Sequence, residues 1–163
     1  MPSDATVHGA PRIPGLDRTS LPGVGDAYTT TREIPSAGVQ LIDLRRYAAI
    51  VTAPTKYSIQ IGVRTHIDGA GTRYLNHSCD PNVFVDAETI SEITLRPLAE
   101  NEALFFFYPA NEWLMTVPFQ CYCKSRRCIG TICGAAATPR DVLRRYRLNR
   151  HIYVLLAITA AGR

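Results

Sequence analysis

The sequence lacks long apolar runs. Its longest candidate, residues 151–161, has about half of the roughly 20 residues that a membrane-spanning helix needs. Residues 1–18 contain no apolar stretch of the kind at the centre of a secretory signal. We therefore expect no membrane attachment. We also expect the chain to work in the cytoplasm, or in the nucleus if the cell is eukaryotic, with reduced thiols.

Cysteine is scarce, and the odd number of five means that the cysteines cannot all pair. Three of them follow a C-x-C-x4-C spacing at Cys121, Cys123 and Cys128. This spacing is too tight for a comfortable set of disulfides and is typical of metal ligation. The alternative is three reduced surface cysteines without a metal. Cys133, a less suitable ligand, is interpreted as a small buried or half-buried thiol.

Charge is unevenly spread along a chain whose 163 residues suit one domain. Residues 80–112 hold seven acids and one base, whereas residues 124–163 hold nine bases and one acid. The acidic part is suited to attract a cationic substrate, and the basic part to contact nucleic acid. Ordinary solvated surface is the commoner explanation of both patterns.

The local patterns predict a mostly-β fold with a helical C-terminal part. Residues 1–21 have no periodicity and are expected to form a flexible leader. We expect strands at 27–33, 39–44, 57–64, 83–87, 92–97 and 103–108, with turns at 34–38 and 66–71. Thr138, Pro139 and Asp141 have the types and spacing of a helix start, so residues 135–163 are expected to form a C-terminal helix.

Three segments together resemble a known family. They are Asn76-His77-Ser78-Cys79-Asp80-Pro81-Asn82, then Leu104-Phe105-Phe106-Phe107-Tyr108, and then the cysteine cluster. Their order resembles the SET domain with a post-SET cysteine tail, the protein-lysine methyltransferase family, and in particular its small stand-alone microbial members. The resemblance implies small curved sheets with a knot-like crossing, a SET domain at 22–117 and a post-SET segment at 118–134.

The same resemblance implies two bound groups, zinc and S-adenosylmethionine. Cys79 would join Cys121, Cys123 and Cys128 as the fourth zinc ligand, which would pin the tail against the cofactor segment. Lys124, Arg126 and Arg127 are expected to donate hydrogen bonds to the sulfur atoms.

The resemblance also assigns roles to single residues. Tyr108 would be the catalytic residue, and Phe106 would influence how many methyl groups are added; both also suit a plain core position on one face of a strand. The cofactor would contact Gly23, Val24, Gly25, Asn76, His77, Tyr108 and Phe119. We assign His77 no role in proton transfer. Trp113 suits either an aromatic wall or the core.

Two residues depart from the family pattern. Phe107 stands where the family has aspartate, and Pro109 where it has glycine. The resulting run of three phenylalanines indicates core packing or an unusually apolar pocket. Residues 44–57 are also short for a segment that helps to bind a substrate peptide. Three hypotheses follow: a methyltransferase acting on a protein lysine, an enzyme acting on a small hydrophobic molecule, or a non-catalytic module that binds a partner through residues 138–163.

Overall fold

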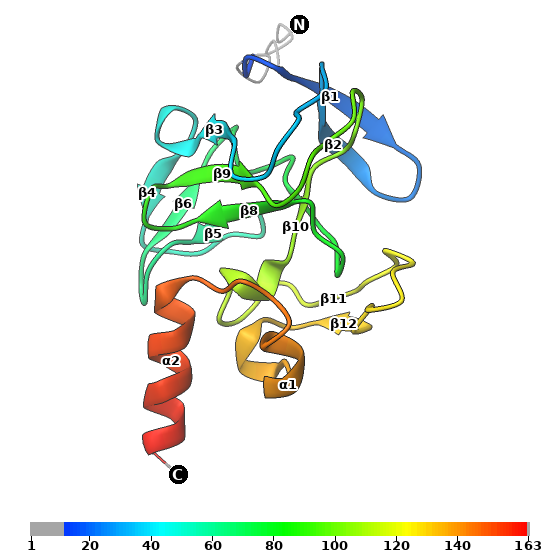
Figure 1. Ribbon diagram of the computed structural model, residues 1–163. Coiled ribbons are helices and arrows are strands. Elements are labelled where there is room, and N and C mark those ends of the chain that lie inside the picture. Colours follow the sequence, from blue (N-terminus) through cyan, green and yellow to red (C-terminus); the bar gives the residue numbers. More distant parts are fainter. Residues whose placement is uncertain (1–11, 163) are drawn as a thin grey trace, which may run out of the picture.

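The structure is a computed structural model that describes residues 12–162, and short strands dominate it (Figure 1). The strands are β1 (Leu16–Leu21), β2 (Gly25–Thr30), β3 (Gln40–Asp43), β4 (Ala49–Val51), β5 (Ile59–Gln60), β6 (His66–Asp68), β7 (Asn76–His77), β8 (Val83–Asp86), β9 (Ser91–Thr94), β10 (Phe105–Phe106), β11 (Phe119–Gln120) and β12 (Thr131–Ile132). The helices are the 3-10 helices η1 (Leu44–Arg46), η2 (Tyr108–Ala110) and η3 (Ala135–Ala137), with α1 (Arg140–Leu143) and α2 (Arg150–Ala161). The mostly-β expectation is confirmed.

The strands form five small sheets, none with more than three strands. Two sheets have three strands, in the orders β3-β9-β8 and β4-β6-β5. The pairs β1-β2 and β11-β12 are antiparallel, and β10 pairs with β7 in parallel. This last pair matters most, because it places two distant predicted site segments side by side. The knot-like crossing stays a prediction.

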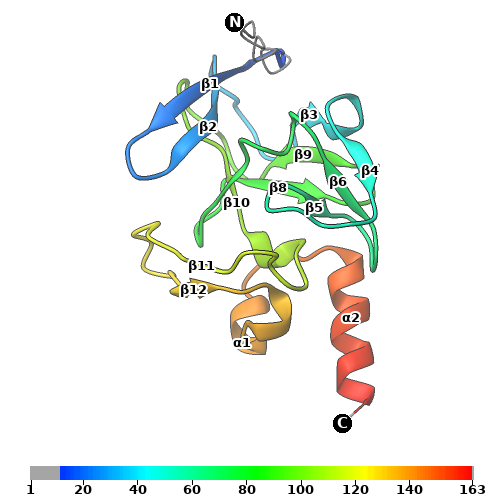
Figure 2. The same ribbon diagram turned by 180° about the vertical axis from the view of Figure 1, so that it is seen from behind.

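Side chains that alternate along two segments point into two of the three hydrophobic clusters formed by the described residues. Val83 and Val85 point into the main core, whereas Phe84 between them points into a second one. Phe106 and Phe107 are split in the same way. The second core also receives buried side chains from α1 and α2, which lie on the same side of the sheets as β11 and β12 (Figure 2).

Several expected boundaries were wrong. Residues 16–21 form β1, which pairs with β2 along its whole length, so a leader does not extend to Leu21. Residues 1–11 of the expected leader lie outside the described residues. The expected turn at 66–71 begins with β6, because Ile67 is buried between two partner strands. The expected strands at 57–64 and 103–108 are only two residues long. The first ends where the chain turns back towards β6, and the second has only the two residues of β7 to pair with.

The C-terminal part is two α-helices rather than one. Asn149 separates them because its side chain binds the body of the protein: Nδ2 donates to the carbonyls of Val85 and Ala110, and Oδ1 accepts from the amide of Ala87. Thr138 does not cap α1, since its hydroxyl donates to the Gly134 carbonyl at 2.8 Å and Pro139 holds the N-cap position. No helix in the described part of the chain is long and apolar enough to cross a bilayer.

Candidate active site and zinc centre

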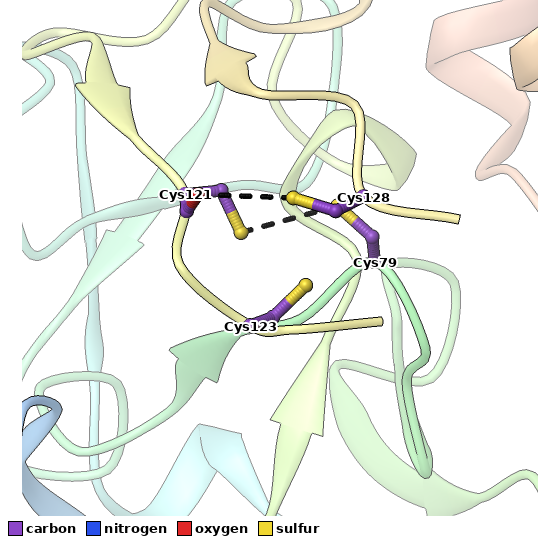
Figure 3. A group of neighbouring side chains, drawn as sticks. All are labelled: Cys79, Cys121, Cys123 and Cys128. Carbon is purple, nitrogen blue, oxygen red and sulfur yellow. Dashed lines mark hydrogen bonds between the residues drawn. The ribbon is translucent and has the colours of Figure 1, made fainter. Parts of the chain in front are cut away.

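Four cysteines meet at one point (Figure 3). The sulfur atoms of Cys79, Cys121, Cys123 and Cys128 all lie within 4.8 Å of one another, and those of Cys79 and Cys121 are 4.0 Å apart. A tetrahedral zinc ion with sulfur ligands at about 2.3 Å requires sulfur atoms roughly 3.8 Å apart. All are free thiols, so the donor set and its spacing fit zinc. Cys133 is not part of this group.

The environment shifts the pKa values of the sulfur atoms in opposite directions: although burial alone would raise it, hydrogen bonds from the backbone and the neighbouring thiols lower the pKa of Cys123 to about 7. Burial raises the pKa of the Cys79 thiol far above its usual range and that of Cys121 to about 11. Such thiols stay neutral unless a cation takes the place of their protons. The Ile129 amide donates to the Cys79 sulfur at 3.5 Å. Arg127, expected to donate to sulfur, forms an ion pair with Asp80 instead.

Cys79 is also tied to the C-terminal segment. The hydroxyl of Tyr146 donates to the Cys79 carbonyl at 2.7 Å. The ring of Tyr146 stacks on Phe107 with 3.7 Å between centroids and 7° between planes. Phe107 is one of the two departures from the family pattern. Its ring therefore supports Tyr146, the residue that holds the Cys79 carbonyl.

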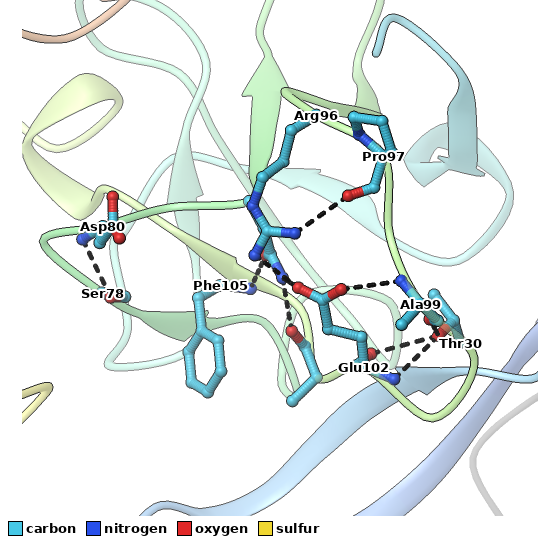
Figure 4. A network of polar contacts seen from close by, with 10 residues as sticks. Thr30, Ser78, Asp80, Arg96, Pro97, Ala99, Glu102 and Phe105 are labelled. Carbon is cyan, nitrogen blue, oxygen red and sulfur yellow. Dashed lines mark hydrogen bonds and ion pairs between the residues drawn. The ribbon is translucent and has the colours of Figure 1, made fainter. Parts of the chain in front are cut away.

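Polar contacts fix the turn that carries Cys79 against the strand that leads to Tyr108 (Figure 4). Asn82 Oδ1 accepts from the Phe105 amide, and Asn82 Nδ2 donates to Glu102 and to the Ala103 carbonyl. Glu102 forms an ion pair with Arg96. The turn itself is closed by the Asp80 amide, which donates to the Ser78 hydroxyl at 3.0 Å.

His77, Tyr108 and Phe119 form an aromatic cluster beside the cysteines. The His77 ring lies 5.1 Å from that of Tyr108 and 5.8 Å from that of Phe119. Burial lowers the pKa of His77 to about 4, so the ring is neutral. Its Nδ1 accepts from the Tyr108 amide, which leaves the proton on Nε2, 3.3 Å from the Cys79 sulfur. His77 thus joins the tyrosine to the metal centre.

Asn76 lies next to the tip of the β1-β2 hairpin. Its Nδ2 donates to the Asp26 carbonyl at 2.9 Å, one residue after Gly25. Gly23 and Gly25 have φ angles of 74° and 95°, which explains glycine at both positions of the tip. The G-x-G segment and Asn76, 51 residues apart from Gly25 in sequence, are therefore neighbours in space.

A narrow cavity of about 50 Å³ opens beside Tyr108. Its lining is Thr55, Lys56, Tyr57, Ser58, Ile59, Thr72, Arg73, Leu75, Phe106, Tyr108, Glu112, Met115, Thr116 and Val117. The Tyr108 hydroxyl donates to the Leu75 carbonyl at 2.8 Å, and the Phe106 ring lies 4.6 Å from that of Tyr108. Burial, with a smaller effect of Glu112, raises the Tyr108 pKa, so its phenol stays neutral.

The expected apolar pocket of three phenylalanines is not this cavity. Only Phe106 of the three lines it, together with mostly polar and charged side chains. Lys56 and Arg73 both lie over the Tyr57 ring, at 4.7 and 5.0 Å from its centroid. Phe107 instead lines a second cavity of about 230 Å³ on the opposite side of the strand, away from Tyr108. Trp113 packs against the second core.

The acidic part of the chain is largely neutralised or buried within the fold, whereas only three bases of the basic part form ion pairs among the described residues. In the acidic part, Asp80, Asp86 and Glu102 form ion pairs with arginines, and Glu92 and Glu112 are buried. In the basic part, Arg127, Arg145 and Arg147 form ion pairs with aspartates. The acidic segment therefore offers little free charge to attract a cationic substrate. Contact with nucleic acid stays a prediction.

Glu112 is the site residue that the sequence did not reveal. It is 7 % exposed, and its Oε1 accepts from the Gln60 amide at 2.7 Å. Burial raises its pKa to about 7. Glutamate is common on surfaces, so neither spacing nor residue type indicated burial beside Tyr108. The one available sign of a buried acid was its position between Asn111 and Trp113, in a stretch rich in apolar residues.

Comparison with known proteins connects this arrangement to one family. A family model described as the SET domain matches residues 16–109. Methyltransferase flvH of Aspergillus flavus is 41% identical over 113 residues, which cover 66% of this chain and 63% of flvH. A histone-lysine N-methyltransferase of Gibberella zeae, H3 lysine-36 specific, is 34% identical over 74 residues. That match covers 42% of this chain and 8% of the relative. The chain thus spans less than two thirds of either relative.

Solved structures share the fold. The methyltransferase domain of human histone-lysine N-methyltransferase SETMAR aligns with a TM-score of 0.54 and 17% identity, over 73% of this chain and 58% of that one. KRYPTONITE in complex with mCHG DNA and SAH aligns with a TM-score of 0.52 and 21% identity, over 71% of this chain and 28% of that one. At these identities the likeness establishes the architecture alone.

Proposed function

Because the chain belongs to the SET-domain family, we propose that it is an S-adenosylmethionine-dependent methyltransferase whose acceptor is the ε-amine of a protein lysine. One observation carries the proposal. Tyr108 contacts the Asn76-His77 segment through its amide and ring, and the same side chain lines the narrow cavity. A tyrosine in this position lies between a cofactor held by that segment and an acceptor entering the cavity.

The residues around β7 would hold the cofactor. The turn at Gly23-Val24-Gly25 and the amide of Asn76 would bind its polar end, and Phe119 with the backbone of His77 would cover its adenine. When bound, S-adenosylmethionine supplies a methyl group on a positively charged sulfur. The zinc centre would fix Phe119, because Cys121 follows it by two residues and Cys79 follows His77 by two residues.

Tyr108 would orient the acceptor rather than remove its proton. Its hydroxyl hydrogen is used in the bond to Leu75, so its oxygen is free to accept a hydrogen bond from the acceptor amine. Such a bond would aim the nitrogen lone pair, and in-line positioning is a large part of the available rate enhancement. Because burial raises the pKa of this phenol, it stays protonated and is a poor base at neutral pH.

The size of the cavity supports a side chain as acceptor. A volume of about 50 Å³ has room for roughly four water molecules. Sites that enclose a whole small molecule usually measure roughly 300 Å³ or more. Tyr57 and Val117, which line the cavity, are 39% and 55% exposed and offer apolar contacts outside it. This combination suits the end of one lysine from a larger partner. We propose that such a reaction takes place in the cytoplasm or nucleus, where thiols stay reduced.

A second candidate keeps the reaction and changes the acceptor. Lys56 and Arg73 beside the cavity suit an anionic group, so a small amine that also carries a carboxylate is the runner-up. The polar lining disfavours the small hydrophobic molecule that the run of phenylalanines suggested.

The test is methyl transfer from radiolabelled S-adenosylmethionine by the zinc-loaded protein. Core histones, ribosomal proteins and a mixture of free amino acids would be offered separately. We expect label in protein. Label in the amino acids alone would favour the second candidate. Calorimetry that detects no cofactor binding would contradict both and favour a partner-binding module, for which α2 offers the exposed Tyr153, Val154 and Ile158.

A further inference from the structure

Glu112 lines the same cavity as Tyr108, and one of its carboxyl oxygens has no hydrogen-bond partner among the described residues. Its Oε1 accepts from the Gln60 amide, and no hydrogen bond or ion pair to its Oε2 occurs within residues 12–162. A buried carboxylate with an unused oxygen is costly unless a positive partner arrives. The cavity wall therefore has a place for a cation.

The backbone around Glu112 is held rigidly from both directions. Its amide donates to the Tyr108 carbonyl at 2.8 Å, so the two residues are one helical turn apart. Its carbonyl accepts from the Ala135 amide at 2.8 Å. Gln60 completes the frame, because its Oε1 accepts from the Trp113 amide and its carbonyl from the Asn111 side chain. This frame fixes the backbone of Glu112, and the bond from the Gln60 amide to Oε1 holds its side chain.

We propose that the Glu112 carboxylate binds the ammonium group of the acceptor beside Tyr108 and takes up the proton that this group must lose. The inference rests on the proposed function. One N–H bond of the ammonium breaks and its proton passes to Oε2, which leaves a neutral amine. The neutral nitrogen could then take the methyl group that S-adenosylmethionine would supply when bound, with the electron pair of the carbon–sulfur bond left on sulfur. The proton later leaves Glu112 for water.

The other charged and titratable groups around the cavity do not duplicate this role. Lys56 and Arg73, which lie over the Tyr57 ring, carry the same sign as the ammonium group and cannot bind it. Burial raises the pKa of Tyr108, so its phenol supplies no negative charge near neutral pH. Within the lining, Glu112 is the sole carboxylate.

The test compares Glu112→Gln with wild type and with Glu88→Gln, an exposed control of the same chemistry. The amide oxygen of the new glutamine can still accept from Gln60, and thermal unfolding checks that the variant is folded. With core histones as acceptor, we expect kcat/KM at pH 7.5 to fall by about 100-fold or more. Wild type should gain activity as pH rises through about 7, where Glu112 ionises. Glu112→Gln should lack this rise, and Glu112→Asp should keep it.

A binding measurement adds a readout that does not depend on turnover. We expect N-acetyl-lysine methylamide at pH 8 to bind wild type about tenfold or more tightly than Glu112→Gln, as judged by ligand-observed NMR. The uncharged N-acetyl-norleucine methylamide should bind both proteins equally. Equal binding of the lysine probe to wild type and Glu112→Gln would overturn the inference. So would a pH profile that is the same in both proteins. Neither result would contradict the proposed methyltransferase activity. Wild type that transfers no methyl group and binds no cofactor would end both proposals.

Discussion

The buried carboxyl group of Glu92 leads to the strongest prediction about stability. Glu92 lies on β9 in the middle of the sheet β3-β9-β8 and has no exposed surface. Neither of its carboxyl oxygens has a hydrogen-bond partner among the described residues. Burial raises its pKa from 4.5 to about 8. Folding at neutral pH must therefore add a proton to this carboxyl group.

The magnitude follows from the pKa shift. The pKa of Glu92 is higher in the folded than in the unfolded protein. Its contribution to the free energy of unfolding is therefore fully present below pH 4.5 and is lost as pH rises through about 8. Each pH unit in this range costs about 1.4 kcal/mol. The cost is about 3 kcal/mol at pH 7 and approaches about 5 kcal/mol above pH 8. Tyr28, a neighbouring titratable group whose pKa burial raises to about 12, does not ionise in this window.

Replacing Glu92 with glutamine keeps the shape and removes the ionisation. We expect Glu92→Gln to match wild type at pH 5 and to exceed its free energy of unfolding by about 3 kcal/mol at pH 7. Urea unfolding of the zinc-loaded proteins, followed by circular dichroism at pH 5, 6, 7 and 8, measures this difference. Exposed Glu88→Gln should change stability by less than about 0.5 kcal/mol. A difference that is the same at pH 5 and pH 8 would refute the reasoning.

Further predictions concern the site and its support. Tyr108→Phe should lose methyl transfer while calorimetry finds cofactor binding unchanged, since the hydroxyl contacts Leu75 and the cavity. Phe106→Tyr should lower the number of methyl groups added per lysine, because an extra hydroxyl would occupy the cavity. Mass spectrometry of the product measures this number. A chelator, or Cys121→Ser, should lower the Tm and abolish cofactor binding, with Cys133→Ser as the control outside the cluster. Asn149→Ala should reduce the free energy of unfolding by about 3 kcal/mol in urea, because three backbone groups lose their buried partner.

The zinc centre could be predicted from sequence because the ligands of one metal ion must lie together, whatever path the chain takes between them. Close spacing identified Cys121, Cys123 and Cys128, and the family resemblance identified Cys79. The proposed roles of Asn76, His77 and Phe119 stay predictions, although the structure places these residues next to Tyr108 or the hairpin tip.

Strand and helix boundaries could not be predicted as well, because they depend on tertiary partners. Residues 103–108 have the composition of a six-residue strand, yet the partner β7 offers only two residues before the chain turns at Ser78. The break between α1 and α2 arises from Asn149, whose amide binds carbonyls far away in sequence. Glu112 was missed for the same reason, since its partner Gln60 is 52 residues away.

The contact between Tyr146 and Cys79 has a practical consequence. The C-terminal segment braces the metal-binding lobe, because the Tyr146 hydroxyl holds the Cys79 carbonyl and its ring covers Phe107. A chain trimmed after the final cysteine would leave that ring stack and that carbonyl open to solvent. Variants shortened from the C-terminal end should therefore retain Tyr146.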